Sequence, residues 1–275
     1  MKEENILFAI QGKTVVVTGA TGILCGAMAE FLAAQGANVV LVGRNEEKGR
    51  QLEAKIQETG GKAVFVAADV MNQGDIERVR DTALETYGTI DILVNGAGGN
   101  RPGASTSDTQ TFFDLPLDDI GGVLSLNLLG SILPSQILGN VMAEKKEGVI
   151  INISSMAAQQ PATKVLGYSA AKAGVDNFTR WLAVHMAQEY SPSIRVNAIA
   201  PGFFLTQQNH YLLVDKDTGG MTARGQKIID NTPMGRYGDP EDLLGCLLWL
   251  ISDGAKFVTG AVIPVDGGFS AYSGV

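Results

Sequence analysis

Cysteine and histidine are scarce in this sequence, and their scarcity excludes several kinds of catalytic site. Among 275 residues there are two cysteines and two histidines. Cys25 and Cys246 lie far apart without ligand-like neighbours, so neither a disulfide framework nor a zinc site is expected. His185 and His210 provide little material for a histidine-based triad or a multi-histidine metal centre. We therefore expect no metal site, and a reducing cytoplasm as the compartment.

The sequence also lacks a basic surplus and long apolar runs. Its formal net charge is −8, whereas a nucleic-acid or anionic-membrane partner requires a basic face. The apolar stretches are strand-sized, so no membrane-spanning helix is expected. The opening MKEENILFAI carries two acidic residues and too short an apolar run for a secretory signal. We expect neither a membrane nor a nucleic acid as a partner.

Short β-branched runs alternate with amphipathic stretches along the chain. Each run is almost continuously apolar, as is typical of strands covered on both faces: 13–19, 37–43, 62–69, 90–98, 148–154, 194–202 and 257–268. Segments 46–58 and 73–87 between them have the spacing of amphipathic helices. The alternation predicts an α/β protein with a Rossmann fold, a doubly wound and mainly parallel seven-stranded sheet with helices on both faces. No linker or repeat divides the chain, so we expect one domain over residues 1–275.

Two connections are longer than such a fold requires. Residues 98–116 follow the fourth predicted strand, and residues 202–233 follow the sixth. Long connections in compact domains usually carry function. Ligands of open α/β sheets bind at the carboxyl ends of the strands, where both connections begin. We expect both segments to be substrate loops.

The first predicted strand leads into VTGATGILCGAMAEFLAAQG, a glycine turn followed by a helix start. Backbone N–H groups and the helix N-terminus at such a turn point towards an anion, and glycines allow the backbone to approach it. The segment is therefore a candidate site for a dinucleotide pyrophosphate.

From this turn onwards the chain resembles the short-chain dehydrogenase/reductase family. The family turn reads T-G-x-x-x-G-x-G, and Thr18 and Gly19 match its first two positions, whereas Ile23 and Cys25 stand at the later glycine positions. The motifs NGAG (95–98), INISSM (151–156), GYSAAKAG (167–174) and PGFFLT (201–206) follow in the family's order. The resemblance implies a cofactor site formed by Thr18, Gly19, Thr21, Gly22, Ile23, Leu24, Asp69, Val70, Asn95, Gly96, Ala97, Tyr168, Lys172, Pro201, Gly202 and Thr206.

The resemblance also implies catalytic roles for Asn127, Ser155, Tyr168 and Lys172. Tyr168 would be the general acid that protonates a substrate carbonyl as hydride arrives from a nicotinamide. Lys172 would hold the nicotinamide ribose, and its ammonium would lower the pKa of Tyr168. Ser155 would hydrogen-bond the carbonyl oxygen. Asn127 would order a water molecule that relays protons to Lys172.

The end of the second predicted strand bears on the choice of cofactor. An acidic residue there would bind the ribose 2′-hydroxyl of NAD, whereas an arginine accommodates the 2′-phosphate of NADP. The sequence has Gly43 at this place and Arg44 next to it. This favours NADP, with NAD as the alternative. Arg44 could equally be a solvated residue beside an Asn45 helix cap.

The choice of substrate depends on weaker features. The chain resembles the branch of the family that reduces sugar acids, in particular D-fructuronate to D-mannonate, in its GILCGAMAE turn, its NGAGGNRP segment and its VDGGFSAYSGV ending. A guanidinium can grip a carboxylate with two hydrogen bonds, so Arg101 is the candidate for that contact. The other candidate substrate residues are Asn100, Ser155, Gln159 and Gln208, with Gln207, Asn209 and His210 as further polar groups.

Other interpretations stay open. The enzyme could reduce another polyol, ketose or acyl carbonyl, and a non-catalytic nucleotide-sensing protein is the alternative of another class. The resemblance implies a homotetramer, and segments 118–143 and 167–188 have enough apolar residues for a subunit interface as well as a core. The C-terminal GGFSAYSGV could cover its own active site or reach a neighbouring subunit.

Overall fold

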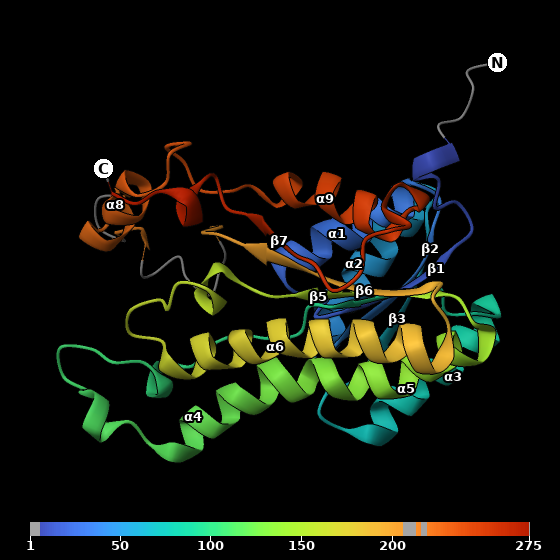
Figure 1. The fold of residues 1–275 in the computed structure, drawn as a ribbon, viewed down its shortest axis with the longest axis horizontal. Coiled ribbons are helices and arrows are strands. Elements are labelled where there is room, and N and C mark those ends of the chain that lie inside the picture. The colour runs from blue at the N-terminus through green and yellow to red at the C-terminus, as the bar shows by residue number, and fades with distance from the viewer. Residues whose placement is uncertain (1–5, 206–212, 216–218, 275) are drawn as a thin grey trace.

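The fold is one parallel sheet covered by helices on both faces (Figure 1). The computed structural model describes residues 6–205, 213–215 and 219–274. Within these residues seven strands pair in the order β3-β2-β1-β4-β5-β6-β7, and every pairing is parallel. The strands are β1 (Thr14–Thr18), β2 (Asn38–Gly43), β3 (Lys62–Ala67), β4 (Ile92–Asn95), β5 (Gly148–Ile153), β6 (Ile194–Pro201) and β7 (Val262–Val265). The predicted Rossmann fold is confirmed.

Two layers of helices cover the sheet. The α-helices are α1 (Ile23–Ala34), α2 (Glu46–Glu58), α3 (Gln73–Tyr87), α4 (Leu117–Leu124), α5 (Gly130–Lys145), α6 (Leu166–His185), α8 (Ala223–Asp230) and α9 (Leu244–Ile251). Short 3-10 turns are η1 (Ile6–Phe8), η2 (Pro102–Ala104), η3 (Phe112–Asp114), η5 (Met156–Ala158), η7 (Pro240–Leu243), η8 (Asp253–Ala255) and η9 (Phe269–Ala271), and single π-turns are η4 (Ser125–Leu129) and η6 (Met186–Tyr190). Figure 1 shows α1, α2 and α9 on one face of the sheet and α3, α5 and α6 on the other.

The two cores follow from the alternation of side chains along each strand. In β1, Val15 and Val17 belong to the cluster that includes α1 and α9 residues, whereas Val16 belongs to the cluster on the opposite face. All three valines are fully buried. A strand with apolar residues at consecutive positions is therefore stable only between two helical layers, which is why these runs predicted a doubly wound sheet.

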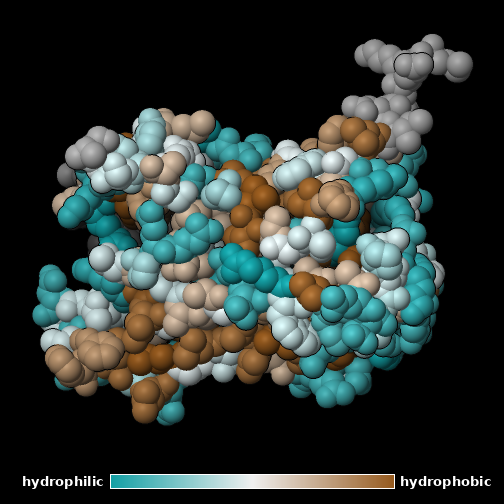
Figure 2. All heavy atoms as spheres, in the orientation of Figure 1, coloured by the Kyte–Doolittle hydropathy of each residue, from teal (hydrophilic) through white to brown (hydrophobic). Residues whose placement is uncertain are grey.

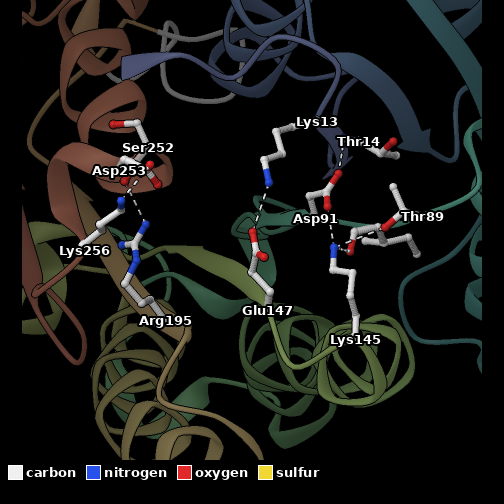
Figure 3. Close-up of polar contacts among 11 residues, drawn as sticks. Lys13, Thr14, Thr89, Asp91, Lys145, Glu147, Arg195, Ser252, Asp253 and Lys256 are labelled. Atoms are coloured by element: carbon white, nitrogen blue, oxygen red, sulfur yellow. Dashed lines mark hydrogen bonds and ion pairs between the residues drawn. The ribbon is translucent and has the colours of Figure 1, made fainter. Parts of the chain in front are cut away.

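The amino edge of the sheet is held by polar contacts (Figure 3). The Asp91 carboxylate, just before β4, accepts a hydrogen bond from the Thr14 backbone N–H at 2.7 Å and pairs with Lys145 at the end of α5. Lys13 pairs with Glu147 at 3.1 Å. Arg195 donates to the Leu250 carbonyl at 2.7 Å, which ties β6 to α9. All of these contacts lie at the amino edge, and the cavity described below lies at the opposite, carboxyl edge of the sheet.

Four segments gather at the carboxyl edge: 98–116, 159–165, α8 and the C-terminal residues. Figure 1 shows α8 and the C-terminus at the same end of the molecule as the loop before α4. The Thr106 N–H donates to the Lys164 carbonyl at 2.9 Å, and the Gln160 side chain donates to the Ser270 carbonyl at 3.1 Å. The rings of Phe203 and Phe269 lie 5.1 Å apart. The C-terminal segment therefore packs over its own chain, and a contact with a neighbouring subunit stays a prediction.

One helical stretch differs from the sequence-based expectation. Residues 117–145, which include α4, η4 and α5, are long and apolar enough to cross a membrane by length and composition. The strand-sized apolar runs read from the sequence did not anticipate this. In the fold, α4 packs against α6, and α5 packs against α3, β4 and β5. Its apolar residues are thus those of a helix that covers a sheet, with part of its surface left exposed.

Candidate active site

A cavity of about 940 Å³ opens at the carboxyl edge of the sheet. One end is formed by the glycine turn, the end of β2 and the residues after β3. The other end is formed by the four segments gathered at this edge, including Arg101, Thr163, Arg224 and Phe269. The same cavity is also lined by Ser155, Tyr168 and Lys172. The fold thus brings the predicted nucleotide turn and the predicted catalytic residues to one site.

The glycine turn fits a dinucleotide. Gly19 has φ +71°, and a Cβ atom there would lie 2.8 Å from the Gly96 carbonyl oxygen, so this position requires glycine. Gly22 is the N-cap of α1 and provides no side chain to occupy the N–H groups of the first turn. Ile23 and Leu24 of that turn line the cavity. These groups would hold the pyrophosphate.

Cys25 explains the departure from the family's turn. Its side chain is buried and fills the space beside Gly96, where an added Cβ atom would lie 2.1 Å from the Cys25 sulfur. Burial raises the pKa of the Cys25 thiol to about 11, against the opposing effect of the Lys172 charge. Cys25 is therefore a protonated packing residue that takes up the room beside the NGAG segment.

The end of β2 has no room for the acidic residue that would select NAD. A Cβ atom at Gly43 would lie 2.8 Å from the Thr21 methyl carbon. Arg44 is exposed and lines the cavity, and it has no ion-pair partner among the residues that the structure describes. Asn45 caps α2, because its side chain accepts the Lys48 N–H at 2.9 Å. Arg44 thus lies at the cavity while Asn45 starts the helix.

Ser155 and Tyr168 form the polar centre of the site. The Ser155 side chain lies beside the Tyr168 hydroxyl and acts to lower its pKa. The Ser155 oxygen also accepts the Ala157 N–H at 3.1 Å, which fixes it at the start of η5. The two hydroxyls lie beside one another because β5 ends at Ile153 and α6 begins at Leu166.

Lys172 lies one turn beyond Tyr168 on α6 and is buried. Its ammonium donates to the Ile153 carbonyl at 2.7 Å and lies 5.6 Å from the centre of the Tyr168 ring. Burial lowers the pKa of Lys172 to about 8, and the negative charge of Asp176 opposes this shift. Asp176 lies one turn further along and accepts a hydrogen bond from the Ser154 hydroxyl.

One electrostatic expectation was wrong for the protein alone. The pKa of Tyr168 is raised by burial, and the Ser155 side chain opposes this shift only in part. The Lys172 ammonium lies over the ring and donates its hydrogen bond to the Ile153 carbonyl. Its charge therefore does not outweigh the rise in the pKa of Tyr168 that desolvation of the hydroxyl causes.

Asn127 lies in the π-turn η4 and is fully buried. Its amide donates to the Gly99 and Val123 carbonyls at 2.7 and 2.8 Å, and its oxygen accepts the Gly99 N–H at 3.1 Å. A Cβ atom at Gly98 would lie 2.6 Å from that oxygen and 3.5 Å from the Lys172 nitrogen. Asn127 therefore holds the loop beside Lys172, and the water relay stays a prediction.

Three predicted residues do not line the cavity. The Thr18 hydroxyl accepts the Gly96 N–H at 3.1 Å beneath the turn. The Asn95 side chain is buried and donates to Ser135 and Asn152, both at 2.9 Å, so it joins β4 to α5 and β5. Gln159 is exposed outside the lining, and its neighbour Gln160 lines the cavity instead. Thr18 and Asn95 support the cavity floor from inside the protein.

The other predicted residues divide into two groups. Cavity-lining ones are Gly19, Thr21, Gly22, Ile23, Leu24, Arg44, Asp69, Val70, Gly96, Ala97, Asn100, Arg101, Asn127, Ser155, Tyr168, Lys172, Pro201 and Gly202. Thr206, Gln207, Gln208, Asn209 and His210 lie outside the described residues.

The lining residues that sequence reasoning missed include Arg224, Lys227, Phe269 and Tyr272. All four lie in segments already singled out, the second long loop and the C-terminal ending. The available signal was the pair of basic residues three apart in TARGQK, which share one face only once that segment is known to be a helix.

Fold and site together define a nicotinamide-nucleotide-dependent oxidoreductase, and comparisons with known proteins agree. A family profile described as enoyl-(acyl carrier protein) reductase matches residues 19–270. An uncharacterised oxidoreductase, UxuB, of Bacillus subtilis is 49% identical over 97% of this chain and 98% of its own length. The chain belongs to the short-chain dehydrogenase/reductase family, as its motifs indicated.

Two solved structures share the fold closely. A protein from Haemophilus influenzae proposed to be a D-mannonate oxidoreductase, solved with bound NAD, has a TM-score of 0.91 and 46% identity, over 98% of this chain and all of that one. A protein from Beutenbergia cavernae proposed to be an NAD(P)-dependent gluconate 5-dehydrogenase, with bound NADP at low occupancy, has a TM-score of 0.84 and 32% identity, over 96% and 99% of the two chains.

Proposed function

We propose that this enzyme reduces the keto group of a sugar acid, D-fructuronate to D-mannonate, by hydride transfer with Tyr168 as the general acid. The observation that carries the sugar-acid assignment is the charge of the cavity wall. Arg101, Arg224 and Lys227 line the substrate end. Asp69 is the acidic residue among the described lining residues, and it lies at the nucleotide end. An anionic substrate suits such a wall better than a neutral sugar.

The chain's own groups account for the proton. A bound nicotinamide cofactor would supply the hydride. Because burial raises the pKa of Tyr168, its hydroxyl stays protonated at neutral pH and can donate to a carbonyl oxygen. Ser155, beside Tyr168, would donate to the same oxygen and stabilise its developing charge. Lys172 would hold the ribose, and Asn127 would keep the loop beside it in place.

For the cofactor we propose NADP. The support is the exposed Arg44 at the cavity and the lack of room for an acidic side chain at Gly43. We expect Arg44→Gln to raise the KM for NADPH about 10- to 100-fold with little change for NADH, because a guanidinium–phosphate contact is lost. Arg80→Gln, which alters an arginine paired with Asp81, is the matched control. A preference for NADH, together with an unchanged KM for NADPH in Arg44→Gln, would contradict the assignment of NADP.

We also propose a homotetramer in the cytoplasm. Supporting exposed apolar residues lie on the helical layer: Leu117 of α4, Leu129 of η4, and Trp181 and Val184 of α6. Figure 2 shows hydrophobic atoms gathered over this part of the molecule. Light scattering on the purified protein should give four chains, and the double variant Trp181→Glu, Val184→Glu should give fewer. A monomeric wild type would contradict the proposal.

The substrate proposal is tested by initial rates of NADPH and NADH oxidation with D-fructuronate. Turnover with either cofactor supports it, and D-mannonate should be the product. A folded protein that binds the nucleotide but does not reduce D-fructuronate would contradict it. Other keto sugar acids, ketoses and acyl carbonyls would then be the substrates to test.

A further inference from the structure

The guanidinium of Arg224 is held by polar contacts at the cavity, and it has N–H donors left for an anion. Arg224 is the second residue of α8, and its side chain is half-buried. One guanidinium nitrogen donates to the Thr163 hydroxyl at 3.1 Å, and the other terminal nitrogen lies 3.4 Å from the Thr163 carbonyl oxygen. A guanidinium has five N–H donors, so three are left for a ligand in the cavity. No carboxylate among the described residues pairs with it.

Thr163 connects this arginine to the reacting groups. It lies in the connection between Ser155 and Tyr168, and it lines the same cavity. The neighbouring Lys164 has a left-handed backbone, with φ +76°, and its carbonyl accepts the Thr106 N–H. The connection is therefore held from both sides, by the first substrate loop and by α8. An arginine placed by such contacts loses little conformational entropy when it binds a ligand.

Lys227 adds a second positive charge on the same side. It is three residues beyond Arg224 on α8, so the two side chains share one face of the helix, and both line the cavity. The helix itself is anchored: Ile228 is buried, and the Tyr237 hydroxyl donates to the Gly225 carbonyl at 3.0 Å. The two charges thus have a fixed support.

Arg101, the arginine favoured by the sequence, is held differently. It is exposed, and its guanidinium lies against Gly122 of α4, where an added Cβ atom would be 2.7 Å from a terminal nitrogen. This contact is steric, and no hydrogen bond within the described part of the chain orients the guanidinium towards the cavity. Of the two arginines, Arg224 is the one whose donors are positioned by polar contacts.

We propose that Arg224, held by Thr163 and assisted by Lys227, binds the substrate's carboxylate and so determines the preference for keto sugar acids over neutral ketoses. This inference rests on the proposed function, since it assigns a residue to the acid group of that substrate. A planar guanidinium can accept a carboxylate with two parallel hydrogen bonds, and the adjacent ammonium stabilises the same charge. A hydroxymethyl group in that place would leave both cations without a counter-charge.

The test compares two substrates that differ only in that group. D-Fructose carries a hydroxymethyl group where D-fructuronate has its carboxylate. The wild-type enzyme should favour D-fructuronate in kcat/KM. Arg224→Gln should lower kcat/KM for D-fructuronate about 100-fold, mainly through KM, and leave that for D-fructose within a factor of about three. Lys227→Gln and Arg101→Gln should each give a smaller loss than Arg224→Gln, about tenfold or less, and Arg80→Gln, outside the cavity, should behave like the wild type.

A binding measurement separates this inference from the proposed function. D-Mannonate cannot react with protein saturated with NADPH, so its effect on the melting temperature reports binding alone. It should raise the melting temperature of the wild type and of the control Arg80→Gln, but not of Arg224→Gln, and D-mannitol should have no effect. Arg224→Lys should restore part of the shift, which excludes misfolding as the cause of the loss.

Two results would overturn the inference. One is an unchanged ratio of kcat/KM for D-fructuronate to kcat/KM for D-fructose in Arg224→Gln. The other is a rise in melting temperature with D-mannonate that survives this substitution. Either could occur while the wild type reduces D-fructuronate, and the proposed function would then stand. Conversely, an Arg224-dependent shift by D-mannonate in an enzyme that does not reduce D-fructuronate would support the anion site and contradict the proposed reaction.

Discussion

The Lys172 ammonium donates a 2.7 Å hydrogen bond to the carbonyl oxygen of Ile153, the last residue of β5. This contact joins α6 to the strand that leads directly into Ser155. It explains how a buried cation is accommodated: the carbonyl replaces part of its lost hydration. It also holds the ammonium beside Tyr168, 5.6 Å from the centre of the tyrosine ring.

Tyr168→Phe should abolish reduction while the nucleotide site stays intact. The variant keeps the ring beside Lys172 but lacks the proton donor, and a general acid contributes about 10²- to 10⁴-fold. We expect a fall of about 1000-fold or more in kcat, with the Kd for NADPH changed by less than about threefold. Fluorescence titration measures the latter. Tyr190→Phe, at an exposed tyrosine on the same helical segment, should behave like the wild type.

The pH profile of reduction should decline on the alkaline side. The pKa of Lys172 is lowered to about 8 by burial, so the ammonium is lost above that pH, whereas Tyr168 stays protonated because its pKa is raised. We expect kcat/KM to be flat up to about pH 8 and to fall above it. A profile that is flat to pH 10 would show that the charge on Lys172 does not matter for reduction.

The same shift has a consequence for stability. The pKa of Lys172 in the folded protein is about 8, below its ordinary value of 10.5, so the unfolded chain binds this proton more tightly. The cost of burying the charge is present in full below about pH 8 and disappears as the pH rises to 10.5. The free energy of unfolding of the wild type should therefore rise relative to that of Lys172→Met as the pH increases from 7 to 10. Urea unfolding at each pH measures this difference.

Asp176→Asn should move the alkaline decline to lower pH. Its carboxylate raises the pKa of Lys172, so removing the negative charge should let burial lower that pKa further. The position also accepts the Ser154 hydroxyl, a contact that asparagine can keep. Asp118→Asn on α4 is the control. An unmoved pH profile in Asp176→Asn would restrict Asp176 to a structural role.

Gly96→Ala should destabilise the protein through Cys25. The added methyl group would lie 2.1 Å from the Cys25 sulfur, and overpacking of this kind costs about 1–3 kcal/mol. Cys25→Gly in the same chain should recover at least about 1 kcal/mol, a coupling measured by a double-mutant cycle. Gly121→Ala is the control, because a Cβ atom there meets nothing within 4 Å. Additive effects would exclude the contact.

Asp91→Ala should lower the free energy of unfolding by about 1–3 kcal/mol, because it removes the acceptor of the Thr14 N–H and the partner of Lys145. Glu147→Gln should cost no more than about 0.5 kcal/mol, since the Lys13–Glu147 pair is exposed. Chemical denaturation measures both. Neither variant should alter the Kd for NADPH, because these residues lie at the amino edge. Equal losses would contradict this ranking.

The sequence by itself determined the fold and the chemical centre. Strands such as 13–19 and 148–154 are apolar at consecutive positions, and only a parallel sheet covered on both faces buries both sides of such strands. The motifs around Ser155, Tyr168 and Lys172 are local, with spacings set by one strand end and one helix, so their meeting at one site could be expected before the structure.

Only the tertiary structure decided which groups surround that centre. Arg101, Gln160, Arg224 and Tyr272 come from four segments far apart in sequence. Arg101, Gln160 and Tyr272 lie outside the regular helices and strands, where no periodicity predicts the direction of a side chain. That is why Gln159 was expected where Gln160 lies, and why Asn95 was expected at the cavity although its amide is used between strands. The pKa of Tyr168 likewise depends on burial, which is a property of the assembled fold.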